Sequence, residues 1–356
     1  MKKTRVLVVE DSLTVRKRLV EVLAADPECE VVAEAEDGKT AIELCRSLKP
    51  DVLTLDMMLP VMSGLAATEY IMAHCPTPIL IVSASTNRGE LFKTYDALAA
   101  GALDVLDKPL GDELTDEWER KLVASVKMAA RIKVITHPRG RLGRARPRIP
   151  VEPTPTTRPG PECRLIAIGA STGGPGAVLQ ILRELPAGFS LPILLVIHIG
   201  KPFAGALSEW LDGHSPVRVS YAVDREPIPP AGKGRVIMAP PDRHLVVQGN
   251  HLRLTDDFER HSCRPSVDVL FESVARELGN RGAACLLTGM GRDGAEGLLA
   301  VRRSGGVTIV QDEASSVVFG MPREAILLGA AERVLPLDQV ASTLLLLAGR
   351  NGARRS

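Results

Sequence analysis

The sequence lacks several features that would each indicate a particular class of protein. It has no charge excess, because 44 lysine and arginine residues stand against 43 aspartate and glutamate residues, a net charge of +1. We therefore expect neither nucleic acid nor an anionic membrane surface as a partner. The six cysteines form no Cys-x-x-Cys pair of the kind that zinc and redox sites use. They are expected to be reduced thiols.

Long hydrophobic runs are also absent. The longest, such as residues 191–199, fall short of the ~20 residues that a membrane span needs, and this one contains Pro192 and His198. The N-terminus reaches Glu10 and Asp11 too soon for a signal peptide. We expect no secretion, no membrane insertion and a cytoplasmic location. No internal repeat relates the two halves of the chain.

The sequence does show two successive alternations of strand-like and helix-like segments. With 356 residues, 45% of them hydrophobic, it is long enough for two domains. Short β-branched runs alternate with amphipathic stretches up to about residue 132, which predicts a (βα)5 domain with a parallel sheet, residues 1–125. Its predicted strands are residues 5–9, 30–33, 52–55, 79–82 and 103–106.

A second α/β domain, residues 163–350, follows a linker at residues 126–162. Residues 137–161 hold seven prolines and six arginines, which indicates an extended spacer, although the arginines could also form a basic docking strip. The second alternation predicts a doubly wound, mostly parallel sheet with a hairpin at residues 243–254. Its predicted strands are residues 165–168, 193–199, 236–238, 284–287 and 307–310.

Polar side chains stand at the carboxyl ends of the first domain's strands, the edge at which open parallel sheets place their chemistry. Glu10 and Asp11 end the first strand, Asp56 the third and Ser83 the fourth, and Lys108 follows the fifth. Three converging carboxylates favour a bound Mg²⁺. Asp56 can then accept a phosphoryl group, Lys108 can neutralise its charge and Ser83 can read the product. The alternative is that the acidic residues only cap helices.

These residues resemble those of response-regulator receiver domains, which have a flavodoxin-like fold. The motifs are Val-Val-Glu-Asp-Ser, Leu-Asp-Met-Met-Leu-Pro, Val-Ser-Ala and Asp-Lys-Pro. The resemblance implies phosphorylation of Asp56, with Mg²⁺ bound by Glu10, Asp11 and Asp56. Val105 stands where the family usually has an aromatic switch residue, so signal transmission by a ring flip is not expected.

In the second domain, Gly169-Ala-Ser171-Thr-Gly173 fits the Gly-x-Ser-x-Gly nucleophile elbow. It follows a buried strand and precedes a helix-like segment, residues 175–185, as that motif requires. The same glycines could instead form a phosphate-binding loop at a helix N-terminus. That alternative needs an acidic residue at the end of the next strand to hold a ribose. The strand ends with His198, which suits a general base.

A serine nucleophile needs an imidazole, and the imidazole needs a carboxylate. His198 is the best-placed imidazole, and we predict Asp293, in a glycine-rich loop after a buried strand, as the carboxylate. Asp268 and Asp312 are rivals whose alternative roles are helix polarity and capping. The remaining histidines are expected to be solvated or structural: His74, His137, His214, His244, His251 and His261.

The second domain resembles the CheB family of chemotaxis methylesterases. The motifs are Gly-Ala-Ser-Thr-Gly-Gly-Pro, Met-Ala-Pro-Pro-Asp-Arg-His-Leu, Arg-Pro-Ser-Val-Asp-Val-Leu-Phe, Gly-Met-Gly-Arg-Asp-Gly and Gln-Asp-Glu-Ala-Ser-Ser-Val-Val-Phe-Gly-Met-Pro. The resemblance implies hydrolysis of glutamyl methyl esters on chemoreceptors, often with deamidation of glutamines. It carries over Ser171, His198 and Asp293 as the triad and the Met290 amide as an oxyanion donor, without a cofactor in this domain.

Two departures from that family and two alternative functions accompany the resemblance. Isoleucine replaces the usual glutamine before His198, and Arg292 replaces a small residue beside Asp293, which could change substrate preference. The family implies a CheA-type histidine kinase as phosphodonor and a resting receiver that covers the esterase cleft. The alternatives are a phosphorylation-dependent binding module with a vestigial serine site and an esterase that acts on another substrate.

Overall fold

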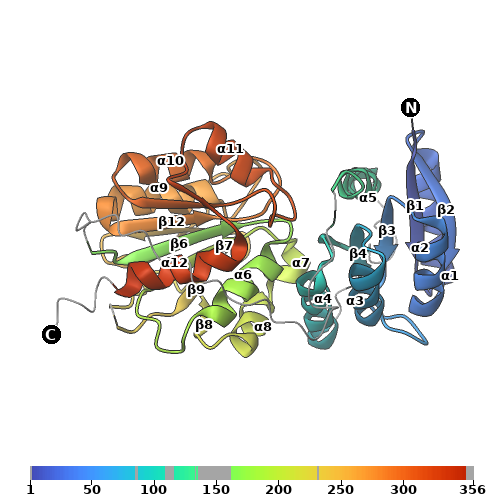
Figure 1. Cartoon of the computed structure of the whole chain (residues 1–356), viewed down its shortest axis with the longest axis horizontal. Coiled ribbons are helices and arrows are strands. Elements are labelled where there is room, and N and C mark those ends of the chain that lie inside the picture. The colour runs from blue at the N-terminus through green and yellow to red at the C-terminus, as the bar shows by residue number, and fades with distance from the viewer. Residues whose placement is uncertain are drawn as a thin grey trace.

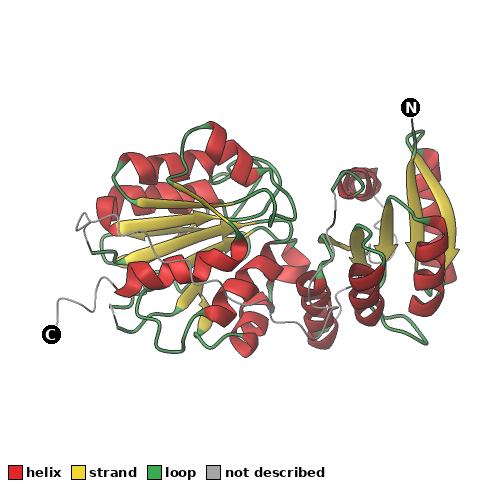
Figure 2. Cartoon of the chain, in the orientation of Figure 1, coloured by secondary structure: helices red, strands yellow, loops and turns green. Residues whose placement is uncertain are grey.

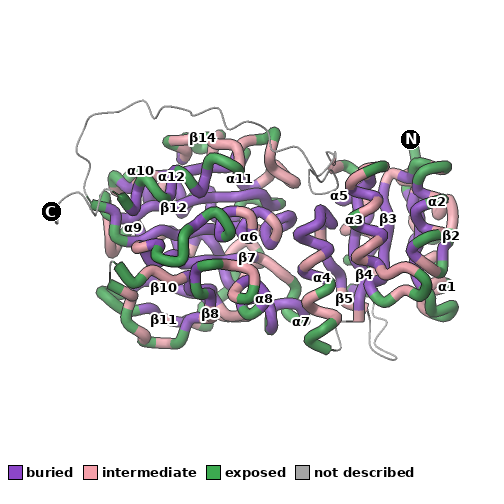
Figure 3. The backbone as a smooth tube through the Cα atoms, turned by 60° about the horizontal axis from the view of Figure 1, so that its bottom comes forward, coloured by how far each residue is buried: buried purple, intermediate pink, exposed green. Residues whose placement is uncertain are grey.

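The structure is a computed structural model that describes residues 2–84, 87–108, 116–132, 134, 162–230 and 232–349. Figure 1 shows two α/β units side by side, the first in blue and teal and the second from green to red. In both units helices cover the two faces of the strands (Figure 2), and the central strands are buried along most of their length (Figure 3). No helix among these residues is long and apolar enough to cross a lipid bilayer.

The first unit has a five-stranded parallel sheet in the order β2-β1-β3-β4-β5. This confirms the predicted (βα)5 fold. The strands are β1 (Thr4–Val9), β2 (Cys29–Ala35), β3 (Val52–Leu55), β4 (Ile79–Ser83) and β5 (Asp104–Asp107). The helices are α1 (Leu13–Ala25), α2 (Gly38–Leu48), α3 (Gly64–His74), α4 (Arg88–Ala100) and α5 (Asp116–Ala129).

Side chains cap the starts of α2, α3 and α4 in the first unit, whereas Ser12 makes no such bond at the start of α1. Asp37 accepts from the amides of Lys39 and Thr40 at the start of α2, and Ser63 accepts from the amide of Ala66 at the start of α3. Such caps satisfy amides that have no partner within the helix. They fix where each helix begins relative to the strand end that carries the site.

The second unit has a seven-stranded sheet in the order β14-β13-β12-β6-β7-β9-β8, in which every pair is parallel. The predicted doubly wound sheet is thus confirmed, together with the hairpin β10–β11. The strands are β6 (Leu165–Ala170), β7 (Ile193–Ile197), β8 (Val219–Tyr221), β9 (Val236–Met238), β10 (His244–Gln248), β11 (His251–Thr255), β12 (Gly282–Leu286), β13 (Val307–Gln311) and β14 (Arg333–Leu335).

The helices of the second unit cover both faces of this sheet. They are α6 (Gly174–Glu184), α7 (Lys201–Ala204), α8 (Leu207–His214), α9 (Val267–Leu278), α10 (Ala295–Arg303), α11 (Met321–Leu327) and α12 (Leu337–Gly349), with a short 3₁₀ turn at Gly279–Arg281. The chain leaves β6 towards β7 on one side and reaches β12 on the other, so the strand order reverses at β6. A crevice outside the carboxyl ends of β6, β7 and β12 is the expected binding position.

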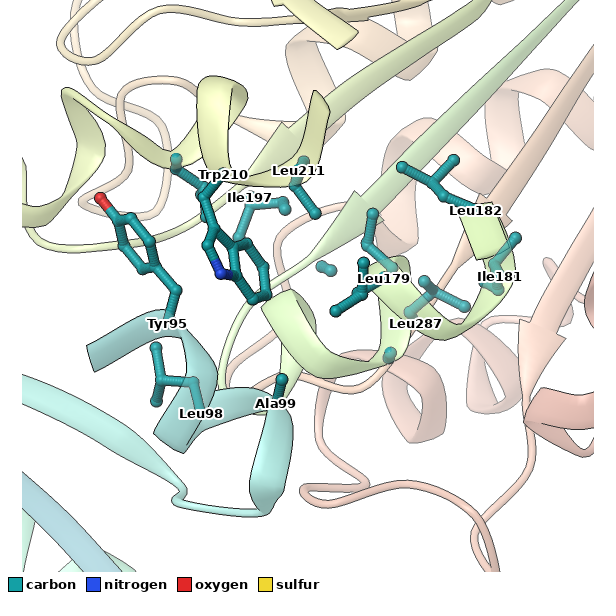
Figure 4. Packing of buried hydrophobic residues seen from close by; sticks show 14 of the residues in the cluster. Tyr95, Leu98, Ala99, Leu179, Ile181, Leu182, Ile197, Trp210, Leu211 and Leu287 are labelled. Atoms are coloured by element: carbon teal, nitrogen blue, oxygen red, sulfur yellow. The ribbon is translucent and has the colours of Figure 1, made fainter. Parts of the chain in front are cut away.

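The two units pack through α4, which lies against α6 and α8. Tyr95 of α4 and Trp210 of α8 are fully buried, and their ring centres are 5.4 Å apart (Figure 4). The Tyr95 hydroxyl donates to the carbonyl of Phe203, and the Trp210 indole N–H donates to Asp96 at 2.9 Å. One apolar cluster therefore continues from the first unit into the second.

The predicted linker falls mostly outside the described residues. Its proline- and arginine-rich part, residues 137–161, lies there entirely, while α5 continues past residue 125 to Ala129. The three domain limits stay a prediction.

Candidate active site and phosphoacceptor site

Ser171 lies in the turn between β6 and α6, at the point where the sheet order reverses. Its amide donates to the carbonyl of Thr288, in the segment that follows β12, at 3.0 Å. Gly173 has a φ of 76°, and a Cβ there would lie 2.6 Å from Val317. A Cβ on Gly289 would lie 2.8 Å from the Ser171 Cβ. Glycine at both positions therefore makes room for the turn and its serine.

His198 follows β7 and is positioned by a backbone contact to the neighbouring strand. Its amide donates to the carbonyl of Ala170 at 2.9 Å. Its Nε2 lies 2.9 Å from Asp293 Oδ2, although the N–H direction is not aligned for a hydrogen bond. Its Nδ1 lies 3.8 Å from the sulfur of Cys263. Burial alone would lower the pKa of His198, but Asp293 and Cys263 raise it to about 9.

The structure brings the three predicted residues to one edge of the sheet without joining all of them. No hydrogen bond among the described residues links the Ser171 hydroxyl to His198. Such bonds are often long or misaligned in enzymes without substrate and tighten in the complex. The assignment of the triad therefore stays a prediction, which the His198–Asp293 contact supports.

Asp293 is 2% exposed, and it is held by groups at the N-terminus of α9. Its Oδ2 accepts from the amide of Val267 at 2.7 Å, and its Oδ1 accepts from the Ser266 hydroxyl at 2.7 Å and the amide of Asp268 at 3.1 Å. Burial acts to raise the pKa of Asp293, but His198, Ser266 and the helix amides outweigh it and lower the pKa. These donors keep a buried carboxylate ionised beside the imidazole.

The two rival carboxylates have other partners. Asp312 accepts from the amide and hydroxyl of Ser315 and so closes a turn. Asp268 is fully buried and accepts from the amide of Gly297 at 2.6 Å, while its other oxygen lies 3.2 Å from Nε2 of His261. Burial raises the pKa of Asp268 to about 6. Neither rival contacts His198.

Three residues near the triad were missed by reasoning from the sequence. Ser266 donates to Asp293, and Cys263 faces the imidazole; both lie in the segment that leads into α9. His244, expected only to be solvated or structural, is fully buried, and its Nδ1 accepts from the amide of Ser266 at 3.1 Å. The Ser-x-Asp pattern at the start of α9 is a helix-start signal that could have drawn attention to Ser266.

Backbone amides near Ser171 can stabilise an oxyanion. The amides of Met290 and Thr172 donate to no acceptor within the part of the chain that the structure describes. Thr172 follows the serine, the position that supplies one oxyanion donor in nucleophile elbows. Met290 is 53% exposed, and Arg292, also exposed, donates to Nδ1 of His261 at 3.2 Å. The side chain of Arg292 is thus held towards the loop at residues 260–263.

In the first unit, the predicted carboxylates meet at the carboxyl edge of the sheet. Oxygens of Glu10, Asp11 and Asp56 lie within 4.8 Å of one another, and Nζ of Lys108 lies 2.7 Å from Glu10 and 3.0 Å from Asp56. Ser83 is buried at the end of β4, where its carbonyl accepts from the amide of Lys108 at 3.0 Å.

The donor set of this cluster fits Mg²⁺. Glu10 is 1% exposed, and its Oε2 contacts Nζ of Lys108, so the cluster of three carboxylates keeps an excess negative charge that a divalent cation would offset. Burial raises the pKa of Glu10. Burial acts to lower the pKa of Lys108, but the carboxylates of Asp56 and Glu10 outweigh it and raise that pKa. One lysine stands against three carboxylates.

The first unit also contacts the turn that carries Ser171. The carbonyl of Leu103, just before β5, accepts from the amide of Gly173 at 3.3 Å. The Asp104 carboxylate accepts a hydrogen bond from Thr172, and burial raises the pKa of Asp104 to about 6. β5 therefore leads from the serine turn to Lys108 in the phosphoacceptor cluster.

Comparisons with known proteins agree with both resemblances. Residues 166–344 match the family described as CheB methylesterase, and residues 6–117 match the response regulator receiver domain. The chain is 43% identical over 340 residues to protein-glutamate methylesterase/protein-glutamine glutaminase 2 of Anaeromyxobacter dehalogenans, covering 96% of each chain. It is 42% identical over 351 residues to the protein-glutamate methylesterase/protein-glutamine glutaminase of Nitrosospira multiformis, covering 98% of each.

Among solved structures, the crystal structure of the Thermotoga maritima CheB methylesterase catalytic domain is 34% identical to this chain. It covers 52% of this chain and 100% of its own, with a TM-score of 0.49.

Proposed function

The chain belongs to the CheB methylesterase family and carries that family's receiver domain, and we propose that it hydrolyses glutamyl methyl esters on chemoreceptors under the control of phosphorylation. Deamidation of receptor glutamines is the second proposed reaction, as the names of the relatives suggest. The observation that carries the proposal is the contact of His198 with Asp293, a carboxylate held by the N-terminus of α9, beside the turn of Ser171. A binding module with a vestigial site is not favoured.

The proposed chemistry is acyl transfer in two steps. The Ser171 hydroxyl attacks the ester carbonyl carbon while His198 takes its proton, and Asp293 fixes the ring and stabilises its charge. The amides of Met290 and Thr172 donate to the oxyanion. His198 then protonates the leaving methoxide, which departs as methanol. With a glutamine, it protonates the amide nitrogen, which departs as ammonia. A water molecule, deprotonated by His198, hydrolyses the glutamyl enzyme.

The first domain supplies the control. Asp56 accepts the phosphoryl group from a histidine kinase of the CheA type, and Glu10, Asp11 and Asp56 hold Mg²⁺. The cation, when bound, neutralises charge on the phosphoryl group. Lys108 pairs with that charge, and the Ser83 hydroxyl contacts the phosphorylated side chain. A cytoplasmic location is part of this proposal, and the domain limits remain those predicted from the sequence.

Docking of the receiver keeps the resting esterase inactive, in agreement with the cover hypothesis. The contacts of Leu103 and Asp104 with the serine turn support this proposal, because they bind the receiver to Gly173 and Thr172, close to the Ser171 nucleophile. Phosphorylation shifts the population towards an undocked arrangement. The variant Asp96→Ala removes the acceptor for the Trp210 indole without changing the esterase domain. It should release more methanol than the wild-type chain when no phosphodonor is present.

Methanol release from a methylated receptor tests the enzymatic proposal. Ser171→Ala should abolish it, while Ser342→Ala, an exposed position on α12, should match the wild-type chain. A fluorophosphonate should label the wild-type chain at Ser171. Wild-type rates from Ser171→Ala would overturn the assignment of the nucleophile. Labelling of Ser171 without demethylation of any receptor would instead retain the esterase and reject the substrate.

A further inference from the structure

Two cysteines of the receiver, distant in sequence, have thiols in contact. Cys45 lies on α2, and Cys75 follows the last residue of α3. Their thiols are near enough for each to change the pKa of the other. The Cys45 sulfur is also 3.3 Å from the Thr77 hydroxyl, which donates to the carbonyl of Cys75 at 2.8 Å. The Thr77 hydroxyl thus links the Cys45 sulfur to the backbone of Cys75.

The pair lines a cavity that is separate from both sites described above. The cavity has a volume of about 410 Å³, and Cys45, Cys75 and Thr77 share its lining with the basic side chains Arg46, Lys49 and His74. It lies where β3 and β4 begin, whereas Asp56 lies where β3 ends. The cavity is therefore at the opposite edge of the receiver sheet from the phosphoacceptor.

The surroundings favour a thiolate within this pair. The hydrogen bond from Cys75 lowers the pKa of Cys45 to about 7, and the same bond raises the pKa of Cys75. At Cys45 hydrogen bonding outweighs burial, whereas burial raises the pKa of Cys29 and raises that of Cys285 to about 12. The thiolate is the reactive form of cysteine, so the pair combines a nucleophilic sulfur with a second sulfur in contact with it.

We propose that Cys45 and Cys75 are a redox-active dithiol that a hydroperoxide oxidises to an intramolecular disulfide. The Cys45 thiolate attacks the peroxide oxygen, the O–O bond breaks, and the sulfur becomes a sulfenic acid as hydroxide or alkoxide leaves with a proton. The Cys75 sulfur then attacks Cys45, the S–O bond breaks and water leaves. The two sulfur atoms together lose two electrons, which reduce the peroxide to water and water or an alcohol.

The proposed disulfide would join α2 to the segment that leads into β4. A crosslink between distant positions restricts the unfolded chain, so the oxidised receiver should unfold at a higher temperature than the reduced one. No contact of the pair reaches Asp56 or Ser171 within the described residues. The modification is therefore independent of the proposed esterase, and its test needs no activity measurement.

The test treats the full-length reduced chain with stoichiometric hydrogen peroxide and then with a thiol-alkylating reagent. Six free cysteines are present. Peptide mapping of the wild-type chain should show a linked Cys45–Cys75 pair that has lost two hydrogen atoms, and a reductant should restore both thiols. The thermal unfolding midpoint of the first transition should rise on oxidation and return on reduction.

Matched serine variants separate this pair from general thiol oxidation. Cys45→Ser and Cys75→Ser should each prevent the crosslink and the rise in midpoint, whereas Cys29→Ser, a buried receiver cysteine, should leave both intact. Peptide mapping of the wild-type chain tests for the Cys45–Cys75 crosslink even if a variant fails to fold. Alkylation of both Cys45 and Cys75 after treatment, or a disulfide of either with another cysteine, would overturn the proposal.

Discussion

The two polar sites of this chain lie at the same kind of place but balance charge differently. Both stand at the carboxyl edge of a parallel sheet, the one around Asp56 and the other around Asp293. In the receiver, three carboxylates have Lys108 as their cation. In the esterase, the carboxylate of Asp293 is surrounded by protein donors from α9 and by His198.

This difference in charge balance explains why one site changes with its ligands and the other does not. A cluster with excess negative charge depends on a cation and a phosphoryl group from outside, so its state changes with its ligands. A carboxylate held by backbone amides has its partners permanently in place, which is electrostatic preorganisation of the kind that catalysis needs. The receiver can therefore respond to a signal while the proposed triad keeps its geometry.

Removing the charge of Asp293 should have the largest effect. Asp293→Asn retains the shape but not the charge that fixes the His198 tautomer, and we expect kcat for methanol release to fall by about 10⁴-fold, as in other serine triads. Asp312→Asn, which alters only a turn with Ser315, serves as the control and should keep wild-type kcat. An unchanged kcat for Asp293→Asn would place the catalytic carboxylate elsewhere, with Asp268 the next candidate.

Chelation of divalent metal should separate the two sites. With EDTA, stimulation by a small phosphodonor should disappear, because the carboxylates of Glu10, Asp11 and Asp56 then lack their cation. Basal methanol release should not change. Asp56→Asn should lose the stimulation whether or not Mg²⁺ is added. Loss of basal activity on chelation would contradict the view that the esterase site is complete without a metal.

Much of this arrangement could be predicted from the sequence, because buried parallel strands leave clear apolar runs and their ends mark the sites. Ser171 and His198 follow such runs directly, and Asp293 lies in the glycine-rich loop after one. Two strands, β8 and β14, were not predicted; each has only three residues and lies at an edge of the sheet. Short edge strands are less buried and so leave a weaker hydrophobic pattern.

What could not be predicted depends on packing between distant segments. Ser266 is recognisable as a helix cap, but its contact with Asp293 depends on how α9 packs beside β6 and β12. Cys263 faces His198 only because its loop crosses the site. The Cys45–Cys75 contact likewise leaves no pattern in the sequence, since the two residues come from different helix ends and fit no redox motif.

Loss of the Ser266 hydroxyl should have an intermediate effect. A hydrogen bond to a charged group contributes about 1.5–3 kcal/mol, so Ser266→Ala should lower kcat/KM by roughly 10- to 100-fold. The matched control is Ser63→Ala, which removes the cap of α3 in the receiver. It should lower the free energy of unfolding by about 1 kcal/mol and leave kcat/KM unchanged. If both variants changed kcat/KM equally, Ser266 would act only as a helix cap and would not support Asp293 in catalysis.

The smallest expected effect is a shift in pH dependence at Cys263. His198 must be neutral to accept a proton, so its raised pKa, about 9, places the rising limb of kcat/KM above neutral pH. Asp293 raises that pKa, and so does the contact of Nδ1 with the Cys263 sulfur. Cys263→Ala should therefore move the limb to lower pH, while Cys29→Ala should not. Cys263→Ser keeps a hydrogen-bonding group, so we expect a smaller shift than for Cys263→Ala. A limb that stays in place in Cys263→Ala would leave Asp293 alone to raise the pKa of His198.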